Sequence, residues 1–157
     1  MKVLLVNSEK CTGCRLCMLA CSLKHEKSFN PLNSRIRVVE DEVLGVYAPY
    51  VCEQCGEHAC VDACAVNAIN YDPKMAIFRV NEDNCVACGN CVKACPYGGI
   101  FLGYNGKALK CDLCEGSPEC INYCTANALQ FIEVTRDVMK MKIKDMLKKL
   151  ESDTVWF

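Results

Sequence analysis

The chain has few histidines, almost no net charge and no long apolar run, and each shortage excludes a class of protein. Only two histidines occur among 157 residues, and there is neither a glycine-rich phosphate loop nor a nucleophile–base signature. The 18 basic and 19 acidic side chains leave a net charge of -1, which argues against nucleic-acid binding. A membrane span needs roughly 18 consecutive apolar residues, and no run approaches that length. The sequence therefore predicts no catalytic site, no nucleic-acid partner and no membrane span.

The first residues lack the features of an export signal. Their apolar stretch, Val3 to Val6, reaches Cys11 without a small-residue cleavage site or a twin-arginine pair. We therefore expect a cytoplasmic location, where thiols stay reduced and disulfides are rare. The 16 cysteines are then candidates for metal binding. Because cysteine accounts for a good part of the 52% hydrophobic content, the ordinary apolar core is thin, and we expect metal centres to stabilise it.

Two cysteine groups have the same tight spacing, C-x2-C-x2-C-x3-C, and we call them type A. They are Cys11, Cys14, Cys17 and Cys21, and Cys85, Cys88, Cys91 and Cys95. Structural zinc usually takes two close pairs separated by a long loop, whereas three cysteines at intervals of three wrap one corner of a cubane. In bacterial ferredoxins the fourth cysteine of this run ligates the other cluster. Both groups therefore indicate [4Fe–4S] clusters.

Two further groups are looser, and we call them type B. They are Cys52, Cys55, Cys60 and Cys64, and Cys111, Cys114, Cys120 and Cys124. Zinc would compete for either group in isolation. A fourth cysteine donated across clusters, however, requires groups to occur in pairs, so four groups of four predict four [4Fe–4S] clusters.

The groups occur in the order A, B, A, B, and the flanking residues repeat with them. Val6-Asn7 precedes the first type A group as Val80-Asn81 precedes the second. Each type B group is followed by a matching segment, ending at Ile69 or Leu129, and then by a predicted strand, at residues 70–71 and 130–134. Spacing leaves two pairings open: groups one with two and three with four, or groups two with three nested between one and four.

Two segments outside the cysteine groups have their own patterns. Residues 35–42 and 46–51 alternate on either side of Gly45 and predict a hairpin, with Pro49 on an edge strand. We expect this small sheet to pack the lobes together, although a partner-facing ribbon fits the same pattern. Residues from Thr135 to about Glu151 have helical periodicity and a lysine-rich face, followed by a tail ending in Trp156 and Phe157. This helix suits either intramolecular packing or anchoring to another subunit.

The two histidines lie close to cysteines. His25 follows Cys21, and His58 lies inside the second cysteine group. Either could donate a hydrogen bond to a cluster sulfur, but we expect ordinary surface histidines.

With these motifs the chain resembles the four-cluster iron–sulfur electron-transfer (beta) subunits of molybdenum and tungsten bis-pterin oxidoreductases. These include DMSO-reductase-family beta subunits and the small subunits of tungsten aldehyde-oxidoreductase-type enzymes. Related subunits serve hydrogenases and carbon monoxide dehydrogenases. The likeness covers about residues 1–132 and includes the strand from Arg35 to Val38 and the segment from Val51 to Cys55. It implies an α+β fold of two bacterial 2[4Fe–4S] ferredoxin-like lobes related by pseudo-twofold symmetry, with an inserted hairpin and a C-terminal helix.

The resemblance also implies the nested pairing. Its ligand sets are Cys11, Cys14, Cys17 and Cys124 for cluster 1; Cys21, Cys111, Cys114 and Cys120 for cluster 2; Cys52, Cys55, Cys60 and Cys95 for cluster 3; and Cys64, Cys85, Cys88 and Cys91 for cluster 4. Residues 1–27 with 101–134 would form an outer lobe and 48–100 an inner lobe. Residues 28–47 would form the inserted hairpin or linker, and 135–157 the C-terminal helix and tail.

The implied function is electron transfer between a larger catalytic subunit and a further redox partner. The catalytic subunit would be a tungsten or molybdenum pterin enzyme. The chain departs from many relatives in having Ala65 after Cys64 and Thr125 after Cys124, where they have proline. It also lacks the long insert of the fourth group and a membrane anchor, which points to a compact soluble complex. The alternatives are a free polyferredoxin, a subunit of a hydrogenase or carbon monoxide dehydrogenase, and a zinc-stabilised interaction module.

Overall fold

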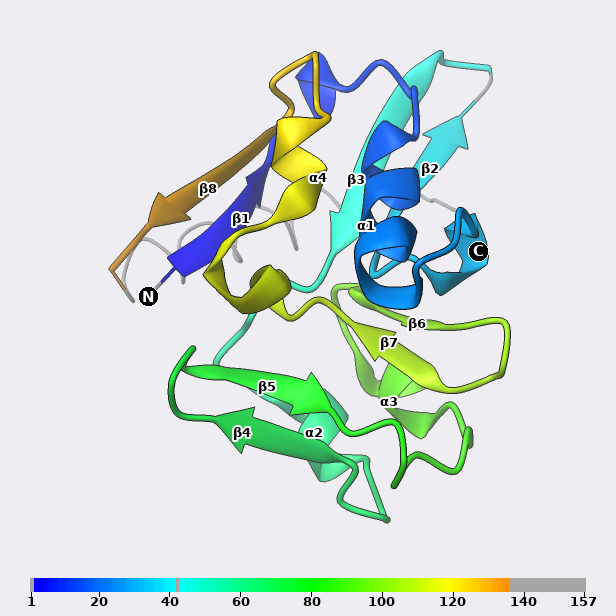
Figure 1. Cartoon of the computed structure of the whole chain (residues 1–157), viewed down its shortest axis with the longest axis vertical. Coiled ribbons are helices and arrows are strands. Elements are labelled where there is room, and N and C mark those ends of the chain that lie inside the picture. The colour runs from blue at the N-terminus through cyan, green and yellow to red at the C-terminus, as the bar shows by residue number, and fades with distance from the viewer. Residues whose placement is uncertain (1, 42, 136–157) are drawn as a thin grey trace.

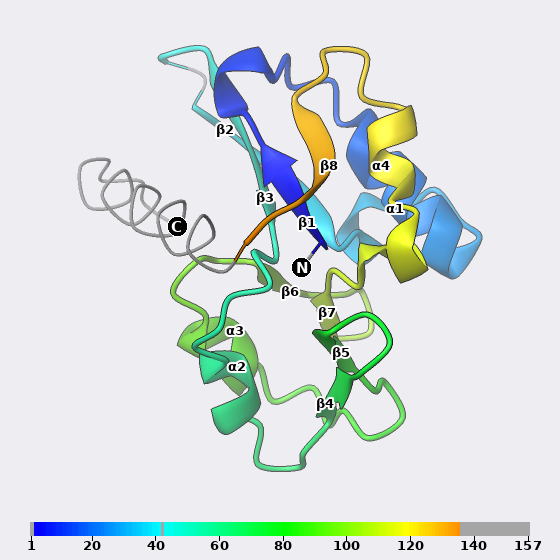
Figure 2. The same cartoon turned by 90° about the vertical axis from the view of Figure 1, so that its left-hand side faces the viewer.

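The computed structural model describes residues 2–41 and 43–135. Apart from Thr135, the predicted C-terminal helix and tail lie outside these residues. Figures 1 and 2 show two halves stacked along the long axis, each combining short helices with two-stranded sheets. Within the described part of the chain, no helix has the length and apolarity required to cross a membrane.

The strands form antiparallel pairs, and one of these pairs joins opposite ends of the described chain: β1 (Lys2–Val6) pairs with β8 (Leu129–Glu133). The other pairs are hairpins. They join β2 (Ile36–Asp41) to β3 (Val46–Val51), β4 (Ile69–Asp72) to β5 (Ile77–Val80), and β6 (Ile100–Leu102) to β7 (Ala108–Lys110). The predicted hairpin after the first cysteine group is therefore confirmed, and it packs against the helix that precedes it.

The repeated flanking residues form the same junction twice. The amide of Asn7 donates to the carbonyl of Ala128 at 2.8 Å, and the amide of Asn81 donates to the carbonyl of Ala68 at 2.7 Å. Asn7 and Asn81 follow the strands that lead into the type A groups, whereas Ala128 and Ala68 precede the strands that leave the type B groups. Each junction thus brings a type A group of one repeat beside a type B group of the other.

The helices are short and begin inside the cysteine groups. They are α1 (Leu16–Glu26), α2 (Ala59–Asp62), α3 (Asn90–Ala94) and α4 (Glu119–Asn122), with 3-10 turns η1 (Ser8–Lys10), η2 (Pro31–Asn33) and η3 (Leu113–Gly116). The residues before α1, α2 and α3 are left-handed, with φ of 59° at Arg15, 51° at His58 and 73° at Gly89. This conformation turns each loop sharply into its helix.

The apolar core is divided between the halves and contains many of the cysteines. One cluster includes Leu4, Ile36, Val51 and Leu129, and the other includes Ile69 and Ile100. The buried cysteines are Cys17, Cys21, Cys52, Cys60, Cys91 and Cys120. Thiols therefore occupy core positions that larger apolar side chains fill in most domains.

Candidate metal centres

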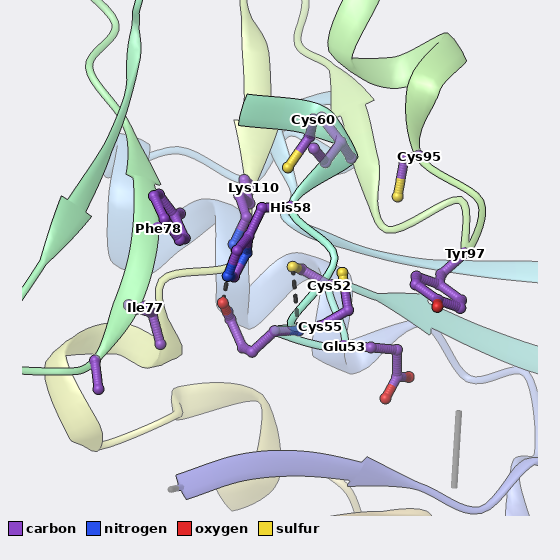
Figure 3. Close-up of a pocket in the computed structure, with 13 residues that line it drawn as sticks. Cys52, Glu53, Cys55, His58, Cys60, Ile77, Phe78, Cys95, Tyr97 and Lys110 are labelled. Atoms are coloured by element: carbon purple, nitrogen blue, oxygen red, sulfur yellow. Dashed lines mark hydrogen bonds between the residues drawn. The ribbon is translucent and has the colours of Figure 1, made fainter. Parts of the chain in front are cut away.

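Three cavities are each lined by four cysteines that come from two different groups. The first holds Cys52, Cys55, Cys60 and Cys95 (Figure 3); the second holds Cys21, Cys111, Cys114 and Cys120; the third holds Cys64, Cys85, Cys88 and Cys91. In every case three cysteines of one group meet the last cysteine of another. We call these the Cys52, Cys111 and Cys85 cavities. Each is named after the first of the three cysteines that come from a single group.

The four remaining cysteines also act on one another. Burial, together with the smaller effects of the sulfurs of Cys14, Cys11 and Cys124, raises the pKa of the Cys17 thiol to about 12. Cys124 ends the fourth group, so this set repeats the pattern of three cysteines with one from elsewhere. The structure thus brings together the four thiols of each set that the resemblance implies.

Backbone amides donate to the sulfur of the last cysteine in each group. Ala68, Gly99 and Ala128 each lie four residues beyond such a cysteine, and their amides donate to Cys64, Cys95 and Cys124 at 3.2, 3.4 and 3.3 Å. Cys21 is the exception, because the chain four residues later is still inside α1 and its amide is used in the helix. The amide of Arg35 donates to Cys21 instead, at 3.2 Å.

The turns that follow the two type B groups each contain a left-handed asparagine. Asn67 and Asn127 have φ of 50° and 51°, and their amides donate to the carbonyls of Cys64 and Cys124, both at 3.0 Å. Asparagine adopts this conformation more readily than most residues. The missing prolines at Ala65 and Thr125 therefore do not prevent the turn that aims an amide at each sulfur.

The sites have the donor set that an iron–sulfur cluster requires. Burial raises the pKa of Cys60 to about 11 and also raises the pKa of Cys91 and Cys111, so a metal-free thiol there resists ionisation. Metal coordination supplies the positive charge that makes such thiols ionise. Amides aimed at the sulfurs then stabilise the remaining negative charge. Four thiols with amide donors around a cavity therefore fit a [4Fe–4S] cluster.

The expectation of an ordinary surface histidine is wrong for His25. Its side chain is 13% exposed, with Nε2 3.4 Å from Asp112 Oδ1 and 3.7 Å from Cys114 Sγ. Burial and the Arg35 guanidinium lower the pKa of His25, and Asp112 opposes them. His58 is half-buried, lines the Cys52 cavity and packs on Phe78 with the rings 4.3 Å apart.

Sequence reasoning missed two polar residues, Lys110 and Gln54, that also line the Cys52 cavity. Lys110 lies in the short strand Ala108–Lys110, all of which is buried. The sequence signal that could have identified Lys110 is its position between the apolar residues Ala108 and Leu109 and the cysteine group that begins at Cys111.

Comparison with known proteins agrees with this geometry. Residues 51–99 match the family described as 4Fe–4S dicluster domain, and residues 8–24 match the 4Fe–4S binding domain. The polyferredoxin-like subunit of aliphatic sulfonate oxidoreductase from Pyrococcus furiosus is 44% identical over 123 residues, which cover 77% of this chain and 70% of that protein. The chain belongs to the 4Fe–4S ferredoxin-like electron-transfer proteins.

Two further likenesses extend over nearly the whole length of this ferredoxin-like protein. An uncharacterized ferredoxin of Methanocaldococcus jannaschii is 32% identical over 157 residues, covering 98% of this chain and 87% of that protein. A chain of the active site complex BamBC of benzoyl coenzyme A reductase has a TM-score of 0.51 and 26% identity, with 96% and 91% of the two chains covered. The predicted 4Fe–4S chemistry and non-catalytic electron-transfer role are confirmed.

Proposed function

We propose that this ferredoxin-like protein carries four [4Fe–4S] clusters on the nested ligand sets. The observation that carries the proposal is the grouping of thiols: three cavities each contain one complete set, and Cys17 is influenced by the other three thiols of the fourth. A tandem pairing would instead place Cys64 with the first group and Cys21 with the second. In the structure Cys64 lines the Cys85 cavity and Cys21 lines the Cys111 cavity.

The strand pairings support the lobes that accompany this assignment. β1 with β8 ties the first group to the fourth, and β4 with β5 ties the second to the third. We therefore assign residues 1–27 with the fourth cysteine group and β8 to an outer lobe. Residues 48–100 with the β6–β7 hairpin form the inner lobe, because Ala108 of β7 shares a core cluster with Ile69 and Ile100. The segment 28–47 contains β2 and the first residues of β3, and β3 continues to Val51.

Electrostatic influences between the thiol sets support a linear order. Cys17 of set 1 raises the pKa of Cys120 in set 2, after the larger effects of burial, Cys21 and Cys114. Cys52 of set 3 likewise raises the pKa of Cys111 in set 2. Cys60 of set 3 and Cys91 of set 4 share one core cluster. The order along the molecule is therefore 1, 2, 3, 4.

The exposed cysteines indicate where electrons enter and leave. Cys14 in set 1 and Cys88 in set 4 are exposed, whereas set 2 and set 3 contain no exposed cysteine. When bound, each cluster takes up and returns a single electron. The protein holds the sulfurs in place and directs amides toward them, and its two exposed ends are the positions for a catalytic subunit and a second redox partner.

The partner we propose is the catalytic subunit of an oxidoreductase, of the tungsten or molybdenum pterin type. The assignment to an oxidoreductase is supported by the relative that is a subunit of aliphatic sulfonate oxidoreductase and by the likeness to a chain of benzoyl coenzyme A reductase. The pterin metal comes from the sequence resemblance. A free polyferredoxin is the second candidate, favoured by the nearly full-length similarity to a protein named a ferredoxin.

Two measurements test the proposal. Anaerobically purified protein should contain roughly sixteen iron atoms and as many acid-labile sulfides per chain, as four cubanes require. Zinc without sulfide would exclude clusters. Purification from the native source should then yield a stable heteromer containing tungsten or molybdenum, whereas a lone chain would favour the free polyferredoxin.

A further inference from the structure

Lys110 is a buried cation beside the thiols of the Cys52 cavity. It is 5% exposed at the end of β7, and its Nζ donates to Gln54 Oε1 at 2.9 Å. Gln54 Nε2 donates in turn to the carbonyl of Cys111 at 2.7 Å. Figure 3 shows the ammonium group of Lys110 on the side of the cavity that holds the sulfur of Cys52.

No carboxylate balances this cation among residues 2–41 and 43–135, where none of the ion pairs includes Lys110. In Figure 3 the carboxylate of Glu53, on the same cavity wall, is turned away from Lys110. An ammonium group without a counter-charge is unfavourable in a protein interior. The ligands can supply the missing negative charge, because Lys110 lines the same cavity as the four cysteines of the proposed cluster.

The equivalent positions in the other half are apolar. Val51 precedes the first cysteine of the second group as Lys110 precedes that of the fourth, and Leu113 occupies the place in the fourth group that Gln54 has in the second. Gln54 and Leu113 share the left-handed conformation, with φ of 51° and 57°. Val51 and Leu113 are 2% and 0% exposed and line the Cys111 cavity. A cation and an amide on one side thus correspond to two aliphatic side chains on the other.

The Cys111 cavity does contain a cation, Arg35, but that charge is already balanced. Arg35 pairs with Glu82 at 3.2 Å and with Asp112 at 3.9 Å. The two cavities therefore differ in their fixed charge: Lys110 contributes an unbalanced positive charge, and Arg35 contributes one that carboxylates offset.

We propose that Lys110 is the counter-ion of the cluster held by Cys52, Cys55, Cys60 and Cys95, and that it raises that cluster's reduction potential above that of the cluster in the Cys111 cavity. This inference rests on the proposed function. A cluster held there would accept one electron from the neighbouring cluster, and Lys110 would lie beside the added negative charge. A fixed positive charge in a medium of low dielectric constant stabilises the added electron. The inner-lobe site is then the preferred position of an electron that crosses between the lobes.

The test is a redox titration of the anaerobically purified holo-protein, followed by EPR, with iron and sulfide counted in every sample. Lys110→Met removes the charge, Lys110→Gln removes it but keeps a hydrogen bond to Gln54, and Lys110→Arg keeps it. The control Lys74→Met removes the same charge from an exposed residue in the turn between β4 and β5. A Cys55→Ser variant identifies the signal that belongs to the Cys52 cavity.

We expect Lys110→Met and Lys110→Gln to make that one potential more negative, with Lys110→Arg close to wild type and Lys74→Met unchanged. Loss of that single cluster in both neutral variants, with full retention in Lys110→Arg, also supports the counter-ion. Unchanged potentials in a fully loaded neutral variant, an equal shift in Lys74→Met, or cluster loss in Lys110→Arg would overturn the inference. A wild-type protein without four clusters would instead contradict the proposed function.

Discussion

Arg79 and Asp112 connect the two halves of the molecule. Arg79, on β5, donates to Asp112 Oδ2 at 3.2 Å, and Asp112 Oδ1 accepts from the amide of Cys114 at 3.0 Å. Arg79 also pairs with Asp72 on the neighbouring strand, at 3.2 Å. A carboxylate within the fourth cysteine group thus holds a strand of the other half. Burial tends to raise the pKa of Asp112, but His25, Arg35 and the Cys114 amide together hold it below its usual value.

Replacing this carboxylate should weaken the molecule. Asp112→Asn keeps the shape of the side chain but removes the charge that faces Arg79 and the largely buried Arg35. We expect a loss of roughly 1–3 kcal/mol in the free energy of unfolding, because charged hydrogen bonds of buried groups are lost. Denaturant titration of the holo-protein, followed by cluster absorbance, measures it.

The matched control is Glu40→Gln, which removes a carboxylate that pairs with Arg15 on the surface. Exposed pairs contribute less than about 1 kcal/mol, so this variant should denature near the wild-type midpoint. Equal losses of unfolding free energy in Asp112→Asn and Glu40→Gln would show that the link between the halves stabilises the protein no more than an exposed ion pair does.

The pairing of cysteine groups can be tested by counting iron in double variants. Cys17→Ala and Cys124→Ala should each remove one cluster, or roughly four iron atoms. Because both residues belong to one proposed set, the Cys17→Ala/Cys124→Ala protein should lose no more iron than either single variant. Cys17→Ala/Cys64→Ala should lose about twice as much.

Tandem pairing of the groups makes the opposite prediction, since Cys17 and Cys64 would then share a cluster. An additive loss for Cys17 with Cys124, and a shared loss for Cys17 with Cys64, would contradict the nested assignment. The remaining EPR signals should stay largely intact in every single variant.

Gly99 allows two segments of one proposed ligand set to approach closely. A Cβ at this position would lie 2.7 Å from the Cα of Cys52 and 2.9 Å from the carbonyl oxygen of Val51. Gly99→Ala should therefore displace Cys52 and destabilise the fold by about 1–3 kcal/mol, as overpacking does. We expect preferential loss of the cluster in the Cys52 cavity, measured as iron content and melting temperature.

Gly56→Ala is the control, because it lies beside Cys55 and a Cβ there would meet no atom within 4 Å. It should keep its iron and its melting temperature. Full iron retention in Gly99→Ala would show that the backbone around Cys52 moves aside without cost.

Removal of iron should unfold the protein. Cysteines occupy both core clusters, and the metal-free thiols would leave buried cavities without the bonds that join the groups. We expect anaerobic treatment with a chelator under reducing conditions to abolish the cooperative unfolding transition, and reconstitution with iron and sulfide to restore it. A metal-free protein that still melts cooperatively would contradict this expectation.

Much of the chemistry could be read from the sequence because it depends on local spacing. The interval of three in Cys11, Cys14 and Cys17 is set by the geometry of a cubane corner, so the pattern alone indicates the cofactor. The hairpin of β2 and β3 was also predictable, since alternation around Gly45 is a local signal. Repetition along the chain likewise indicated that type A and type B groups alternate.

Long-range placement was decided only by the tertiary structure. Spacing left two pairings open, because Cys124 approaches Cys17 only when β1 and β8 pair from opposite ends of the described chain. The burial of His25 and Lys110 likewise depends on which segments pack over them. The sequence alone does not distinguish a buried lysine from an exposed one. Local sequence determined which thiols are candidate ligands, whereas packing between distant segments decided which thiols lie together and which charges lie beside them.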